Sequence, residues 1–320
     1  MRQTRIVLEL ALAAGLCLLS GCGGSGGEKK EKNNLEYSRD LASKEYLVRL
    51  AAVKALSESA TPEDTVATPH LIGMLRDGNE TIRRFAAAAL EKIRDPLAIP
   101  GLIDAASDES SYVRYQSVGA LVNFYDDPRA RQAIIRALGD DNGYVRHIAV
   151  TRIGETADPA MVDMVLPLLD DENNYVRAAA AGALGKLGSA KAIDPLIRAL
   201  DDPNSYVRSF SASSLGRLEA RQAIPDLKRR LNDPSPWVVN HAARALAWMG
   251  EDDGIPFLVA NLSSPVEDKE NAVSEEAVEF LREISGSDFG FDPGAPEEKR
   301  REAIRRWETW AAERAPGAGG

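Results

Sequence analysis

The sequence predicts an all-α fold, a right-handed α-solenoid (superhelix) of about seven helix pairs with a C-terminal helical cap. Three observations predict it. One motif recurs seven times with a period near 31 residues, the apolar residues within each copy return at helical spacing, and a turn signal divides each copy in two. A period of this length is typical of stacked units that each bury their apolar face only against their neighbours.

The first 21 residues have the layout of a secretory signal peptide. Arg2 and Arg5 precede an almost wholly apolar stretch over residues 6–19, and two small residues follow it. The apolar stretch has about 14 residues, whereas a helix needs roughly 20 to span a bilayer. We therefore expect residues 1–21 to be an export signal and not part of the fold.

The end of this segment, Leu19-Ser20-Gly21-Cys22, resembles the lipobox of bacterial lipoproteins. The resemblance implies cleavage before Cys22, a diacylglycerol on its thiol and acylation of its new amino group. Two or three acyl chains, such as palmitate, are enough for stable membrane attachment. The alternative is an ordinary signal peptide followed by a chance cysteine.

Residues 22–34 have the composition of a flexible tether, Gly and Ser followed by Glu, Lys and Asn. Gly23 stands where lipoproteins kept at the inner membrane by enteric-type sorting carry Asp. The resemblance therefore implies a lipid-anchored protein of the bacterial cell envelope and favours the outer membrane over the inner membrane.

The repeats begin near residue 46, and the centre of each copy is a buried-type Val or Ile that is followed by Arg in every copy but the last. The spacings between these centres are 34, 31, 32, 31, 31 and 31 residues. The central residues are Val48, Ile82, Val113, Val145, Val176, Val207 and Val238.

Each copy predicts a helix A, a turn, a helix B and a second turn. In the fifth copy, apolar positions from Val176 to Leu184 return every three or four residues, and Gly188 marks the turn before a second amphipathic stretch. The small residues at 178–181 should let neighbouring helices approach closely. Pro167 falls inside helix B of the fourth copy, where it removes a hydrogen bond and should kink the helix.

The copies at 170–200 and 201–231 show the full pattern: Asp, Val-Arg, Ala-Ala or similar small residues, Leu-Gly, then Ala-Ile and Leu. This pattern resembles the HEAT-repeat family, most closely the short bacterial version first described in phycobilisome-lyase subunits. The resemblance covers about residues 42–262 of a repeat domain that we place at 35–262. It implies an α-solenoid but no particular activity, because such arrays serve unrelated tasks.

The second to sixth copies each also carry an aspartate five residues before the centre and an arginine directly after it. The arginines are Arg83, Arg114, Arg146, Arg177 and Arg208, and the aspartates are Asp77, Asp108, Asp140, Asp171 and Asp202. Since Arg binds carboxylates in bidentate geometry, we expect a structural ladder in which each arginine reaches an aspartate or a helix-end carbonyl of an adjacent turn. The alternative is an arginine row that binds an anionic ligand. Val239 replaces the arginine of the seventh copy, where the ladder should end.

An aromatic residue precedes the centre in five consecutive copies. These residues are Tyr112, Tyr144, Tyr175, Tyr206 and Trp237. Equivalent positions of a stack fall on one line, so the rings should form a stripe near the starts of the A helices. The stripe either packs over the preceding turns or is a contact surface for a partner protein, because Tyr and Trp are enriched at binding hot spots.

The segment at 263–315 departs from the repeat. We expect a last A-type helix over 272–284, a Gly/Pro/Asp loop over 286–296, a capping helix over 296–313 and a disordered tail at 316–320. Solenoids need such caps to shield their last apolar layer.

The composition excludes several kinds of site. The chain has 39 Lys and Arg against 49 Asp and Glu, a net charge of −10, which argues against nucleic acid as the main partner. Two cysteines exclude a disulfide framework or a thiolate zinc site. The three histidines match no metal-binding pattern, so we expect no metal and no cofactor. They are His70, His147 and His241.

These observations favour a non-catalytic scaffold that binds another envelope protein or peptide and touches the membrane only through its lipid. Iron-binding HEAT-like hydroxylases use His-Glu pairs, and no histidine here precedes a glutamate. We therefore expect that the protein is not an enzyme. The alternatives are a structural lipoprotein subunit of an envelope complex and a lyase-like HEAT-repeat enzyme.

Overall fold

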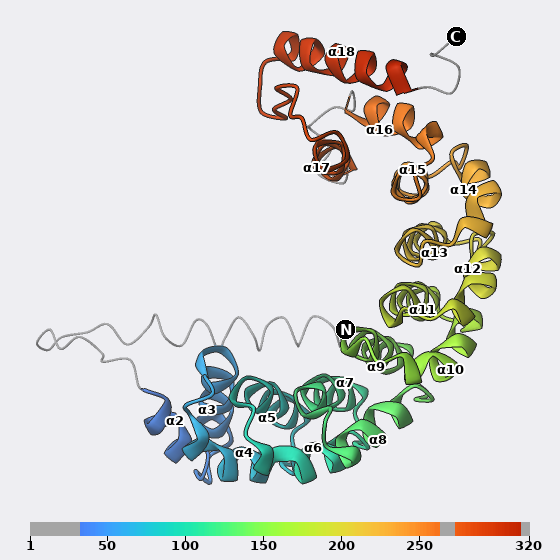
Figure 1. The fold of residues 1–320 in the computed structure, drawn as a ribbon. Coiled ribbons are helices and arrows are strands. Elements are labelled where there is room, and N and C mark those ends of the chain that lie inside the picture. Colours follow the sequence, from blue (N-terminus) through green and yellow to red (C-terminus); the bar gives the residue numbers. More distant parts are fainter. Residues whose placement is uncertain (1–32, 263–272, 315–320) are drawn as a thin grey trace, which may run out of the picture. The chain divides into compact units, whose positions relative to one another are not determined.

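The computed structural model describes residues 33–262 and 273–314, and every regular element in these ranges is helical (Figure 1). The predicted α-solenoid is confirmed, with seven helix pairs over the predicted repeats. The A helices are α3 (Tyr46–Ser59), α5 (Glu80–Ile93), α7 (Ser111–Leu121), α9 (Gly143–Thr156), α11 (Asn174–Leu187), α13 (Ser205–Arg217) and α15 (Pro236–Trp248). The B helices are α4 (Thr68–Met74), α6 (Ile99–Ala105), α8 (Pro128–Ala137), α10 (Val162–Val165), α12 (Ile193–Ala199), α14 (Ile224–Arg230) and α16 (Ile255–Asn261).

Short 3₁₀ turns join the two helices of most pairs, a feature that the sequence pattern did not predict. Those that lead into B helices are η1 (Thr65–Ala67), η2 (Pro96–Ala98), η4 (Pro159–Met161), η6 (Ala190–Ala192), η7 (Arg221–Ala223) and η8 (Asp252–Gly254), while η3 (Val122–Phe124) follows α7. The six that lead into B helices end the turn that reverses the chain from the A layer to the B layer, whereas η3 begins that turn directly after α7.

Consecutive A helices pack side by side in one layer, and the B helices form the other (Figure 1). The described central Val and Ile residues of the second to seventh copies are fully buried. Small residues bring the A helices together, as predicted: a Cβ added at Gly154 of α9 would lie 2.8 Å from the Cα of Ala183 in α11, and one at Gly216 would meet Ala245 equally closely. Glycine at these positions therefore permits the close approach of neighbouring helices.

Four of the A helices, α5, α9, α11 and α13, begin at an asparagine cap, and several A helices end at a left-handed residue. The side-chain oxygen of Asn173 accepts a hydrogen bond from the N–H of Tyr175 at 2.9 Å, and Asn79, Asn142 and Asn204 cap their helices in the same way. After α11 the left-handed position is Gly188, with φ 71°. The equivalent turns after α5, α9 and α13 use non-glycine residues at positive φ, namely Arg94, Ala157 and Glu219.

Pro167 disrupts its helix as predicted. The α-helix α10 ends at Val165, and the chain continues as the 3₁₀ segment η5 (Leu166–Asp170). A proline cannot donate the hydrogen bond that would continue the α-helix, and its ring clashes with the preceding turn.

Helix α2 (Asn34–Asp40) precedes the first pair and packs on α3. It begins one residue inside the segment that we expected to be a tether. The reason is local: the amide of Asn34 donates to the carboxylate of Asp64 at 2.9 Å and to the carbonyl of Ser59. Cys22, the predicted signal and most of the tether lie outside the described residues, as does the tail at 316–320.

Helices α17 (Val273–Ser285) and α18 (Glu297–Arg314) close the C-terminal side of the array, and both contact α16. Trp307 of α18 is fully buried, and its ring meets that of Phe289 edge-on with centroids 4.6 Å apart. The pair covers the last apolar layer, which is the role expected of a cap. Among the helices of the described residues, none combines the length and the apolar composition needed to cross a bilayer.

Candidate partner-binding surface

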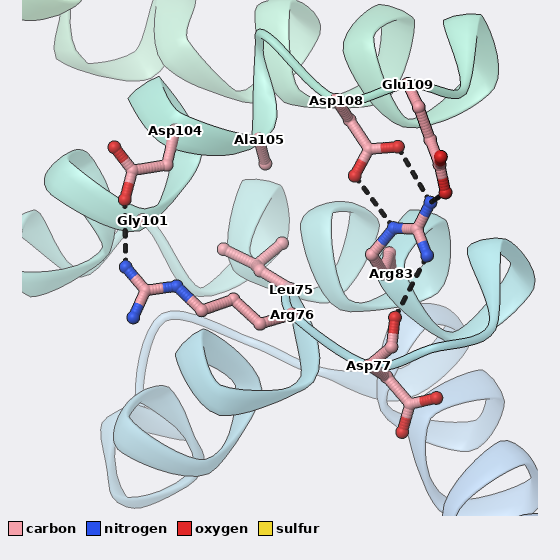
Figure 2. A pocket seen from close by; sticks show the side chains of 9 residues that line it. All are labelled: Leu75, Arg76, Asp77, Arg83, Gly101, Asp104, Ala105, Asp108 and Glu109. Atoms are coloured by element: carbon pink, nitrogen blue, oxygen red, sulfur yellow. Dashed lines mark hydrogen bonds and ion pairs between the residues drawn. The ribbon is translucent and has the colours of Figure 1, made fainter.

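The arginines of the repeats join each unit to the next. Figure 2 shows the rung between the second and third copies, where Arg83 Nε and Nη2 donate to the two carboxylate oxygens of Asp108 at 2.7 and 2.8 Å. Its Nη1 donates to the backbone carbonyl of Asp77 at 2.9 Å, and Glu109 lies 3.2 Å from Nη2. Arg83 therefore bonds its own unit and the following unit at once.

The same rung recurs along the array, always from one arginine to the aspartate of the next copy. The pairs are Arg114–Asp140, Arg146–Asp171, Arg177–Asp202 and Arg208–Asp233, with nitrogen–oxygen distances of 2.7–2.8 Å. Arg49 adds a rung to Asp77 at 2.9 Å. Arg49 and Asp233 were not among the ladder residues predicted from the sequence, although both occupy the repeat positions that define the ladder.

Each ladder aspartate also fixes the start of an A helix. Asp171 accepts the N–H of Asn173 at 2.8 Å in addition to the two bonds from Arg146. Burial alone would raise the pKa of Asp171, but the hydrogen bonds from Arg146 and Asn173 and the charge of Arg146 outweigh it and hold the pKa below its ordinary value. Because the ladder guanidiniums are buried and bonded within the protein, they serve the fold and are not offered to an anionic ligand.

The tyrosines beside this ladder are exposed. Tyr112, Tyr144, Tyr175 and Tyr206 have exposed fractions of 64%, 66%, 57% and 58%, and we refer to these four residues as the tyrosine stripe. They stand at the second position of successive A helices that pack side by side. Trp237, at the equivalent position of α15, differs: it is partly buried, and its ring stacks on His241 with centroids 6.3 Å apart.

Two hollows lie along the stripe. Tyr112, Tyr115 and Tyr144 line the first, which has a volume of about 440 Å³. The second has a similar volume of about 440 Å³ and lies between α9 and α13, with Tyr175 and Tyr206 among its lining residues. Each hollow is therefore lined by two stripe tyrosines from neighbouring A helices.

Small residues of α11, including Ala179 and Gly182, line the second hollow together with Phe210 of α13. His147 borders it from α9, and burial lowers the pKa of His147, which favours its neutral form. This hollow was not predicted from the sequence. The signal was present in the run of Ala and Gly on one helix next to Phe210 on the next.

One pair of side chains has the composition of a nucleophile and base. Ser209 Oγ lies 2.9 Å from His241 Nδ1. The same nitrogen lies 2.8 Å from the carbonyl oxygen of Trp237, to which it can only donate. A protonated nitrogen cannot remove the proton of Ser209, which is itself buried. Within residues 33–262 and 273–314, no group of three His, Cys, Asp or Glu side chains is arranged to hold a metal ion.

Comparison with protein families now identifies the repeat. Residues 68–146, 132–214 and 193–279 match the family model of HEAT repeats. The chain belongs to the HEAT-repeat family. No curated protein sequence matches it significantly.

Two solved structures with TM-scores above 0.5 show the same fold. The Escherichia coli protein YibA is 20% identical with a TM-score of 0.55, over 82% of this chain and 99% of YibA. A chain in the structure of Kap95p bound to RanGDP is 14% identical with a TM-score of 0.56, over 89% of this chain and 46% of that one. A chain in the complex of CpcE and CpcF of phycocyanin lyase from Nostoc is 18% identical, with a TM-score of 0.46, over 82% of this chain and 99% of that one. At these identities the likeness concerns the fold alone.

Proposed function

We propose that this HEAT-repeat protein is a non-catalytic scaffold, anchored by lipid on Cys22 in the bacterial cell envelope, that binds another envelope protein or peptide through the tyrosine stripe. The observation that carries the proposal is the exposure of four tyrosines at one repeat position on adjacent A helices. Tyrosine is enriched among residues that dominate binding energy. Large exposed apolar groups that gather on one surface are typical of interaction sites.

The fold supplies a physical reason for binding. The arginine–aspartate rungs fix the loops that lead into the A helices, so the tyrosines hold their positions before a partner arrives. A surface that is ordered in advance loses less conformational entropy on binding. A lipid anchor would confine the protein and its partner to one membrane and raise their effective concentration.

Proximity labelling in the native cell tests this proposal, with a labelling enzyme fused to the C-terminus of the full chain. The wild-type protein should label a small set of envelope proteins, and Cys22→Ala should lose that set because the anchor is gone. Labelling of bystander proteins only would contradict the scaffold function. Turnover of a substrate by the purified protein would instead support a lyase-like enzyme.

A second arm tests the surface. The Tyr144→Ser, Tyr175→Ser double variant should lose the labelled partner and keep its helical circular dichroism and melting temperature. Leu97→Ser is the matched control, since Leu97 has the same exposed fraction as Tyr144, 66%, but lies in η2 on the B side. If the double variant still labelled the partner, or if Leu97→Ser lost the labelling equally, the tyrosine stripe would not be the binding surface.

A further inference from the structure

A row of exposed carboxylates accompanies the tyrosine stripe. Glu109, Asp141 and Glu172 each stand three residues before a stripe tyrosine, and their side chains are 86–89% exposed. Each lies beside a ladder arginine, at 3.2, 2.5 and 3.4 Å, but most of each carboxylate remains open to solvent. The edge of the A layer therefore alternates aromatic rings with negative charges.

The spacing of this edge limits what can bind it. Packed helices lie about 8–10 Å apart, so the tyrosines of successive A helices recur at about that interval. A polyproline II helix has three residues per turn and rises about 3.1 Å per residue, so one of its faces returns about every 9 Å. The two periods agree, and an extended segment along the edge would present every third residue to a tyrosine.

We propose that the tyrosine stripe binds a proline-rich, cationic segment of a partner protein in the polyproline II conformation. The inference rests on the proposed scaffold function and names the chemistry of its partner. Prolines at every third position would pack on the rings, as in other aromatic-lined grooves that bind such segments. Lys or Arg residues between them would pair with Glu109, Asp141 and Glu172.

Charge selects this partner over others. The carboxylate row repels an acidic peptide and the anionic surface of a bilayer, and the net charge of −10 adds to that repulsion.

The length of the stripe sets the length of the segment that it can bind. The four tyrosines span three helix intervals, about 24–30 Å, which about eight to ten polyproline II residues cover. Affinity should therefore rise with peptide length up to about ten residues and then level off.

Fluorescence anisotropy with the full-length lipoprotein in detergent tests the proposal against labelled 12-residue peptides. The first peptide repeats Pro-Lys-Ala four times. The second has the same composition in an order that never places prolines three residues apart, and the third has Glu in place of Lys. We expect the first to bind, the second to bind at least about tenfold more weakly, and the third not to bind. Equal affinity for all three would overturn the proposal.

Variants of the protein locate the site. The double variant Tyr144→Ser, Tyr175→Ser should bind the first peptide at least about tenfold more weakly than wild type, while Leu97→Ser should bind it with unchanged affinity. Neutralising the carboxylate row by Glu109→Gln, Asp141→Asn and Glu172→Gln should weaken binding at least about fivefold at low salt and reduce its salt dependence. The matched control neutralises three exposed acids elsewhere, Asp104, Asp163 and Asp288, and should bind like wild type.

The two proposals fail separately. Partner labelling in cells that depends on the stripe, together with no peptide binding, would overturn the polyproline II inference and leave the scaffold function standing. Peptide binding that is insensitive to the tyrosine and carboxylate variants would also overturn the inference, because it would place the peptide at another surface.

Discussion

Removal of the Arg146 guanidinium should weaken the junction between the fourth and fifth repeats. Arg146 donates to both carboxylate oxygens of Asp171 at 2.7 and 2.8 Å and to the carbonyl of Asp140 at 2.8 Å. The side chains of Arg146 and Asp171 are both nearly buried. Arg146→Ala therefore strands a buried negative charge and leaves a backbone carbonyl without its partner.

The expected cost follows from this geometry. Breaking a buried ion pair by removal of one partner costs about 3–5 kcal/mol, because the other charge remains buried. Asp171 retains the hydrogen bond from the N–H of Asn173 at 2.8 Å. The loss of folding free energy in Arg146→Ala should therefore lie near the lower end of that range, about 3 kcal/mol. Adding Asp171→Asn to Arg146→Ala removes the stranded charge, so the double variant should recover part of that loss.

Urea unfolding followed by circular dichroism measures these effects under identical conditions for all variants. Arg129→Ala is the matched control, because Arg129 pairs with Asp127 at 2.7 Å on the exposed surface of α8, and its urea midpoint should not move. If Arg146→Ala shifted the midpoint no more than Arg129→Ala, the rungs would not hold the repeats together. A double variant less stable than Arg146→Ala would also refute the reasoning.

Three other predictions concern local structure. Ala157 and Gly188 both occupy left-handed turns, with φ 51° and 71°, so Ala157→Gly should stabilise and Gly188→Ala destabilise the protein by about 1 kcal/mol each in urea unfolding. Folding holds the pKa of Asp171 below its ordinary value of 3.8. The stability that charged Asp171 contributes is therefore present above that pH and lost as the pH falls through the folded pKa. Asp171→Asn should reduce the difference in urea midpoint between about pH 6 and pH 3. Gly154→Leu should force α9 from Ala183 and lower the melting temperature by more than Gly188→Ala.

The ladder could be predicted because its residues recur in register with the buried centre of each copy. Residues at one repeat position have equivalent neighbours in a stack, so an Arg and an Asp that recur together meet at every junction. Arg49 and Asp233 obey the same register. Pro167 was also predictable, since its effect depends only on its own backbone.

Features that depend on which side chains of neighbouring helices surround a position could not be predicted from the repeat pattern. Trp237 shares its repeat position with the tyrosines, but its ring stacks on His241, a residue that the other A helices do not have there. The hollow beside Tyr175 exists because α11 has small Ala and Gly residues there and because Phe210 of α13 borders them. Repeat position predicts the backbone environment, whereas burial depends on the side chains that surround each copy.

Site-specific photo-cross-linking in living cells tests most directly whether the tyrosine stripe is the binding surface. A photoreactive amino acid would replace Tyr175 in the full chain, and in a second form it would replace Gln132, an exposed residue of the B helix α8. We predict one discrete cross-linked partner from position 175 and none from position 132. Equal products from both positions, or none from position 175 at normal protein levels, would contradict a partner-binding role for the stripe.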